Sequence, residues 1–244
     1  MSRLIRYFLI LFISIPAIQA GEITKDTKQL ILGIADNWDS SYVKLTHYER
    51  GLRGNWKIEG TWNGRLGRNG LAWGIGLHDI PAGAKLKREG DGRTPAGIFD
   101  ISHGAYGYAS TIRKKSNLPY HQITTRSLWY EDTSSPRYNS FQLLDHEPRS
   151  TAEKKAQMRQ GDYAHALKLF ISHNAPPRAQ PGFGSAIFFH IWREGGGKPT
   201  AGCTTMAEQN LKAMISRIDP SKNPRYVILP RAEYEKVKDY WKLP

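Results

Sequence analysis

Cys203 is the only cysteine of the 244-residue chain, and it follows the small, polar residues 200–202 (TAG). An unpaired cysteine is most often a buried structural residue. Here the polar flanks, and a glycine that lets the backbone approach a ligand closely, favour a nucleophile instead. A single cysteine also excludes a disulfide within the chain and any metal site built from several cysteines.

A thiol nucleophile needs a base, and histidine is the obvious candidate. None of the eight histidines follows Cys203, so the base precedes the nucleophile, which excludes the papain-like order. His190 ends the apolar run 186–189 (AIFF), and the end of a strand is where a rigid scaffold presents catalytic groups. His173 and His103 are the alternatives.

Residues 205–218 form the clearest predicted helix. Thr205 and Glu208 have the spacing of a capping box, and apolar residues follow on one face. Cys203 would then lie at a helix N-terminus, where the dipole favours a thiolate. We therefore expect the pKa of Cys203 to lie below its ordinary value of about 8.5.

The remaining pattern predicts a mainly β (α+β) fold with peripheral helices. Apolar or alternating runs predict strands at 29–35, 42–48, 56–62, 71–77, 98–101, 166–171, 185–191 and 225–229. Asn63-Gly64 and Asn69-Gly70 are hairpin-turn signals, residues 88–97 form a polar loop, and 151–160 and 232–241 are predicted helices. No linker is visible, so residues 21–244 are expected to form one domain.

The first twenty residues have the layout of a secretory signal peptide. Arg3 and Arg6 precede the uncharged apolar stretch 7–15, and Ala20 is the expected cleavage site. An uncleaved anchor is the alternative, but the stretch is short for a membrane span. We expect a periplasmic protein with no stable membrane insertion after cleavage. The net charge of the full chain is +13, which favours an anionic partner.

Two motifs resemble those of one family. Residues 187–203 (IFFHIWREGGGKPTAGC), together with 90–97 (GDGRTPAG), resemble the YkuD-type L,D-transpeptidases, and more narrowly their proteobacterial branch; Tyr138-Asn139 is similar to a further segment of that branch. The resemblance implies a YkuD-like β-sandwich, Cys203 as nucleophile and His190 as base, with no metal or cofactor. It also implies peptidoglycan stem peptides as donor and acceptor.

The sequence departs from the pattern of many members, which read Ser-His-Gly-Cys followed closely by arginine. Here residues 200–206 read TAGCTTM, which lacks both that histidine and the arginine. The upstream histidine is retained as His190. The departure therefore concerns donor and acceptor preference, and it leaves the nucleophile unchanged.

In the implied mechanism, the backbone N–H groups of Gly202 and Cys203 hold the oxyanion. The candidates for binding substrate are Arg193, Arg93, Asp91, Thr94 and Thr200. For Asp91 and Thr94 we favour hydrogen bonds within the loop, and for Lys198 a solvated charge. An L,D-carboxypeptidase that uses water as acceptor, and a non-catalytic basic module that binds cell wall or nucleic acid, are the alternatives. Export from the cytoplasm and the lack of a nucleic-acid-binding motif argue against nucleic acid as the partner.

Overall fold

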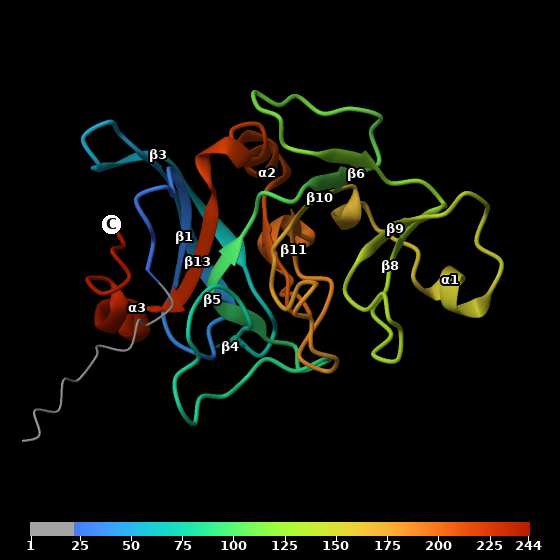
Figure 1. Ribbon diagram of the computed structural model, residues 1–244, viewed down its shortest axis with the longest axis horizontal. Coiled ribbons are helices and arrows are strands. Elements are labelled where there is room, and N and C mark those ends of the chain that lie inside the picture. Colours follow the sequence, from blue (N-terminus) through green and yellow to red (C-terminus); the bar gives the residue numbers. More distant parts are fainter. Residues whose placement is uncertain (1–21) are drawn as a thin grey trace, which may run out of the picture.

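The structure is a computed structural model that describes residues 22–244, so the predicted signal peptide lies outside the described residues (Figure 1). Eleven strands form one sheet in the order β4-β5-β13-β1-β2-β3-β12-β11-β10-β6-β7. In chain order these strands are β1 (Gln29–Ala35), β2 (Tyr42–Arg50), β3 (Trp56–Arg65), β4 (Leu71–Trp73), β5 (Thr94–Asp100), β6 (Ala105–Gly107), β7 (Tyr120–Gln122), β10 (Leu167–Phe170), β11 (Phe188–Ile191), β12 (Thr204–Met206) and β13 (Arg225–Pro230).

The other elements are small. β8 (Ser127–Trp129) and β9 (Phe141–Leu143) pair with each other, and the helices are α1 (Thr151–Lys155), α2 (Glu208–Ile215) and α3 (Arg231–Val237). Among the described residues the sheet dominates, so the mainly-β prediction is confirmed. No helix in residues 22–244 is long and apolar enough to cross a membrane.

The two halves of the large sheet share one hydrophobic core. Leu30, Phe99 and Val227 come from one half, and Leu169 and Phe189 come from the other, yet all belong to the same buried cluster. Figure 1 shows β1, β5 and β13 at the left of the molecule and β10 and β11 near its centre. The sheet therefore bends around its core like a sandwich, and this brings β5 towards β11 and β12.

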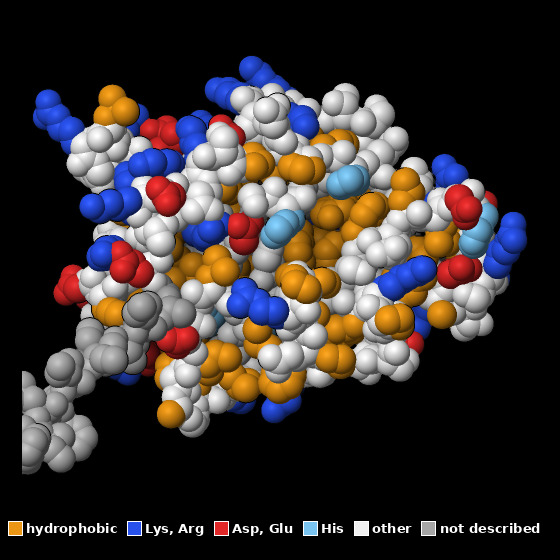
Figure 2. Space-filling view, viewed as in Figure 1, with side chains coloured by type: hydrophobic (Ala, Val, Ile, Leu, Met, Phe, Trp, Pro, Cys, Tyr) orange, Lys and Arg blue, Asp and Glu red, His pale blue; other side chains and the backbone are white. Residues whose placement is uncertain are grey.

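A second, aromatic cluster lies on the opposite face of β10 and β11. Phe170 and Phe188 point away from the main core and pack against Trp129, with ring centroids 4.7 and 4.8 Å away. Tyr106 closes the cluster from β6. Figure 2 shows hydrophobic side chains gathered on this face between β5 and the β8–β9 pair. The segment that carries β8, β9 and α1 thus covers this side of the sheet.

Most predicted strands are confirmed, with changed ends. The turn predicted at Asn63-Gly64 is wrong, because both residues lie within β3, where Gly64 pairs with Val43 and Met206. The Asn69-Gly70 turn is present: the Gly70 N–H donates to the Gly67 carbonyl at 2.9 Å. β5 begins at Thr94, inside the region predicted as a loop.

The predicted capping box is also wrong. Thr205 lies in β12, where it pairs with His190 on one side and Arg65 on the other. α2 begins at Glu208, and its N-cap, Ala207, offers no side-chain hydrogen bond. Thr205, which the local pattern predicted as the start of a helix, is therefore part of the sheet. As a result, Cys203 precedes a strand, and the helix dipole is not available to it.

Candidate functional site

The two sequence motifs meet in space at Thr94. Its side-chain oxygen accepts a hydrogen bond from the Gly67 N–H at 2.8 Å and donates to the Cys203 carbonyl at 3.5 Å. The backbone around Gly67 also holds the second motif, because the Arg68 N–H donates to the Thr200 carbonyl at 2.8 Å and the Thr200 N–H donates to the Leu66 carbonyl at 2.8 Å. Three segments that are distant in sequence therefore fix the loop that carries Cys203.

The loop before Cys203 is braced from within. The Thr200 hydroxyl donates to the Cys203 carbonyl at 2.7 Å and accepts from the Gly202 N–H at 3.0 Å. This N–H, one of the two predicted oxyanion donors, is thus already bonded within the loop. Gly202 has a φ of +155°, and a Cβ added there would lie 3.0 Å from the Arg93 carbonyl oxygen. The close contact between the two motifs therefore requires glycine.

The thiol of Cys203 lies at the edge of the aromatic cluster. Its Sγ is 3.4 Å from the Phe188 N–H, which donates to it, and 3.5 Å from the Ala186 carbonyl, to which it donates. Burial raises the pKa of Cys203 above its usual value, and the Phe188 N–H and the charge of Lys168 offset only part of this. The prediction of a lowered pKa is therefore wrong, because burial outweighs the favourable contacts and no helix dipole acts on the thiol.

His190 lies on the face of β11 that also presents Phe188. It is 2% exposed, its Nδ1 is 2.8 Å from the Ile191 carbonyl oxygen, and its ring centroid is 4.7 Å from that of His165. Burial lowers the pKa of His190 to about 4, so its ring is neutral at pH 7. No hydrogen bond joins it to Cys203 in the described part of the chain.

Arg193 lies on the far side of this histidine pair. Its Nε donates to Asp162 at 2.5 Å, and its second guanidinium nitrogen lies 3.0 Å from His165 Nε2. Burial, together with the charges of Lys168, His190 and Arg193, lowers the pKa of His165 to about 3. Arg193 therefore acts on the surroundings of His190, and its guanidinium is already engaged by a carboxylate.

The residues of the first motif have internal partners. The Asp91 carboxylate accepts from Lys87 Nζ at 2.5 Å and from the N–H groups of Arg88 and Arg93 at 2.8 and 2.9 Å, which agrees with the loop-fixing role that we favoured. The Arg93 guanidinium donates to the Leu71 carbonyl at 2.9 Å and pairs with an aspartate on the β1–β2 connection. Asp91 and Arg93 thus hold the loop from both sides.

The other histidine candidates lie elsewhere. His173 is fully buried, accepts from the Ile75 N–H at 3.2 Å and lies 2.9 Å from the Phe183 carbonyl. His103 is largely exposed, 3.8 Å from Asp100. Neither has a described contact with Cys203. No group of three or more histidine, cysteine or acidic side chains in residues 22–244 is placed to hold a metal ion.

The relation of this site to known proteins rests on one comparison. A family model described as the YkuD L,D-transpeptidase catalytic domain matches residues 55–228, which include both motifs and Cys203. The chain belongs to the YkuD family. No curated protein and no solved structure gives a significant match.

This YkuD domain has a cavity of about 560 Å³ that borders the aromatic cluster at Trp129 and that the sequence patterns did not indicate. Trp129 and Glu131 line it, with Glu89 at one side and Lys155 at another. Trp129 also packs on Phe188, the residue whose N–H donates to the Cys203 thiol. The negative charge of Glu131 raises the pKa of Cys203, so this residue of the cavity wall acts on the thiol through its charge.

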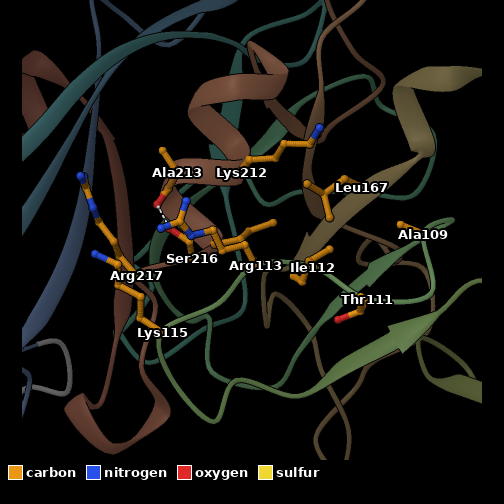
Figure 3. A pocket seen from close by; sticks show the side chains of 11 residues that line it. Ala109, Thr111, Ile112, Arg113, Lys115, Leu167, Lys212, Ala213, Ser216 and Arg217 are labelled. Carbon is orange, nitrogen blue, oxygen red and sulfur yellow. Dashed lines mark hydrogen bonds between the residues drawn. The ribbon is translucent and has the colours of Figure 1, made fainter.

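A second, larger hollow of about 640 Å³ lies beside α2 (Figure 3). Arg113, Lys115 and Lys212 lie at its edge, with Ile112 and Leu167 as apolar walls. Leu167 belongs to the main-core face of β10, and neighbouring strand residues point to opposite faces. This hollow therefore opens on the other side of β10 from the thiol.

Proposed function

We propose that the protein is an exported peptidoglycan L,D-transpeptidase with Cys203 as its nucleophile. The observation that carries this proposal is the position of Cys203. The carbonyl of the residue is held by Thr94 and Thr200, which come from the two motifs, while its thiol packs against an aromatic cluster, and one member of that cluster, Trp129, lines a cavity. A backbone fixed in this way suits a nucleophile that must meet a substrate in one orientation.

The proposed reaction is an acyl transfer in two steps. The Cys203 proton passes to His190, and the thiolate attacks the carbonyl carbon of a bond between an L-centre and a D-residue. The Cys203 N–H stabilises the oxyanion, and His190 then gives the proton to the departing nitrogen, so that the D-residue leaves as an amine and a thioester remains. The amine of a second stem peptide then attacks the thioester, which releases the thiol and forms the cross-link.

The surroundings of the thiol favour an amine over water as the acceptor. Trp129, Phe170 and Phe188 form an apolar wall beside Cys203, and a site of this kind excludes water and protects a thioester from hydrolysis. Glu131 and Glu89 give the neighbouring cavity an acidic side, which attracts a cationic amine. These features support the transferase over the L,D-carboxypeptidase.

The periplasmic location is part of the proposal and rests on Arg3, Arg6, the apolar stretch 7–15 and Ala20. N-terminal sequencing of the exported protein is expected to start at Gly21. An intact Met1 in the membrane fraction would show an uncleaved anchor instead.

The activity is tested with purified muropeptides and mass spectrometry of the products. Wild type is expected to give cross-linked dimers, and Cys203→Ala none, with the fold retained. His190→Ala is expected to lose most of the activity, while His103→Ala, which changes an exposed histidine, serves as the matched control. Dimers from Cys203→Ala would refute the cysteine mechanism, and trimmed monomers alone from wild type would show a carboxypeptidase.

A further inference from the structure

Lys168 is a buried cation on the same face of the sheet as the thiol. It pairs with His190 across β10 and β11, and His190 pairs with Thr205 across β11 and β12, so all three side chains point to one side. The Lys168 ammonium lies 5.4 Å from the centre of the Phe188 ring. The N–H of the same residue donates to the Cys203 thiol, so Phe188 contacts both the ammonium, through its ring, and the thiol, through its backbone.

This lysine has no anionic partner in contact. It is 4% exposed, and within residues 22–244 no hydrogen bond or ion pair within 4 Å engages its ammonium. Buried lysines are normally paired, because the desolvation of an ammonium is costly. The contrast with Lys87, which is equally buried but paired with Asp91, shows that this fold can supply a partner where the role is structural.

Four charged or titratable groups interact with Lys168: Cys203, Glu131, His165 and His190. Burial lowers the pKa of Lys168 to about 8, and the charges of Cys203 and of Glu131, beyond β8, oppose this. His165 and His190 have pKa values of about 3 and about 4, so both are neutral at pH 7. Lys168 is therefore the cation that faces the thiol from the sheet.

The effect is mutual, because interacting charges shift each other. Lys168 is the first among the charged side chains that lower the pKa of Cys203; Lys87 acts in the same direction and Glu131 in the opposite one. Burial raises the pKa of the thiol against all of them. Without Lys168, the thiolate would form in an apolar cleft with little to balance its charge.

We propose that Lys168 is the counter-ion of the Cys203 thiolate. The inference rests on the proposed function in one respect, that Cys203 is the nucleophile. In the acyl-transfer step the thiol proton still passes to His190. Lys168 keeps its three protons, forms no bond, and stabilises the negative charge on Sγ until the carbonyl carbon is attacked.

The first test is the rate at which neutral iodoacetamide alkylates Cys203 between pH 6 and pH 10. Lys168→Met is expected to lower the rate about tenfold near pH 7, where the Lys168 ammonium is protonated; this corresponds to a rise of roughly one unit in the pKa of the thiol beside a charged Lys168. Lys168→Arg, which keeps the charge, is expected to restore most of the rate. Lys212→Met, which removes an exposed lysine on the other side of the sheet, is expected to match wild type.

A Lys168→Met profile that overlays the wild-type profile would overturn the proposal. So would an equal shift in Lys212→Met, because net charge alone would then explain the effect. The assay needs no peptidoglycan. If Lys168→Met slows alkylation as expected but the wild-type protein forms no cross-links from muropeptides, the proposed function is refuted and the ion pair between Lys168 and Cys203 is still supported.

A second measurement decides the matter if Lys168→Met does not fold. The pKa of Lys168 is followed by NMR of its side-chain nitrogen in wild type and in Cys203→Ala, with Lys168→Arg used to assign the signal. Removal of the thiolate is expected to lower the pKa of Lys168, since the interaction is reciprocal. The same Lys168 titration in both proteins would overturn the proposal.

Discussion

Replacing Thr94 with valine removes one hydroxyl from the junction of the two motifs while nearly keeping the side-chain volume. The hydroxyl is buried, since Thr94 is 1% exposed, and it joins the Gly67 N–H to the Cys203 carbonyl. In Thr94→Val the buried Gly67 N–H loses its acceptor. The Cys203 carbonyl keeps a second donor in Thr200, at 2.7 Å.

The expected magnitude follows from these two contacts. An unsatisfied buried N–H costs about 1–3 kcal/mol. The contact of 3.5 Å to the Cys203 carbonyl is long for a hydrogen bond and adds little. We therefore expect Thr94→Val to lower the free energy of unfolding by about 2 kcal/mol, which corresponds to a fall in Tm of about 4–8 °C for a domain of this size.

Urea unfolding and thermal melts measure this loss, and alkylation of Cys203 reports on the site itself. Thr94→Ser, which keeps the hydroxyl and loses a methyl group, is the matched control and is expected to retain most of the stability. A Thr94→Val protein within about 0.5 kcal/mol of wild type, or a serine variant as unstable as the valine one, would refute the role given to the hydroxyl.

Three further changes test other parts of the site. Gly202→Ala is expected to cut cross-linking by at least about tenfold, because the new Cβ meets the Arg93 carbonyl at 3.0 Å; unchanged product yield in the muropeptide assay would contradict this. Asn139→Leu removes four side-chain hydrogen bonds, three of them buried, and is expected to destabilise the protein by about 3 kcal/mol, measured as the urea midpoint. Burial alone would raise the pKa of Asp91, but hydrogen bonds from Lys87 and two backbone N–H groups outweigh it and hold the pKa below its usual value of 3.8. Asp91 therefore stabilises the fold above that value and loses its effect as the pH falls through the lowered pKa, so the Tm of Asp91→Asn should depend less on pH than that of wild type between pH 5 and pH 2.

Long apolar runs made most of the sheet predictable from sequence. β1 and β13 are buried strands with continuous hydrophobic residues, and β2 alternates as a half-buried strand does. β12 has only three residues, too few to show any periodicity, and Thr205 with Glu208 imitates a helix start next to it. Only the neighbouring strands, which no local pattern reveals, decide that Thr205 belongs to the sheet.

The site was predictable as far as its motifs reach. The meeting of residues 90–97 with Cys203 agrees with the paired motifs, and the bracing by Asp91 and Thr200 uses contacts within one loop. The environment of the thiol was not predictable in this way. The thiol packs against an aromatic cluster that includes Trp129, which is distant in sequence. Lys168 lies in an otherwise apolar strand, where a lysine is normally interpreted as a surface residue. These long-range contacts set the sign of the pKa shift of Cys203.

The pairing of β1 with β13 has a consequence for how the protein reaches its active form. The parallel register joins Leu30 to Arg225 and Ala35 to Pro230, and Thr94 meets Cys203 across 109 positions of sequence. Contacts of such separation form slowly, because a long chain loop must close before they contribute. If the chain is exported N-terminal end first, as we propose, β1 reaches the far side of the membrane well before its partner β13. Thr94 likewise arrives well before Cys203, so the contact that joins the two motifs forms only after residue 203 has followed.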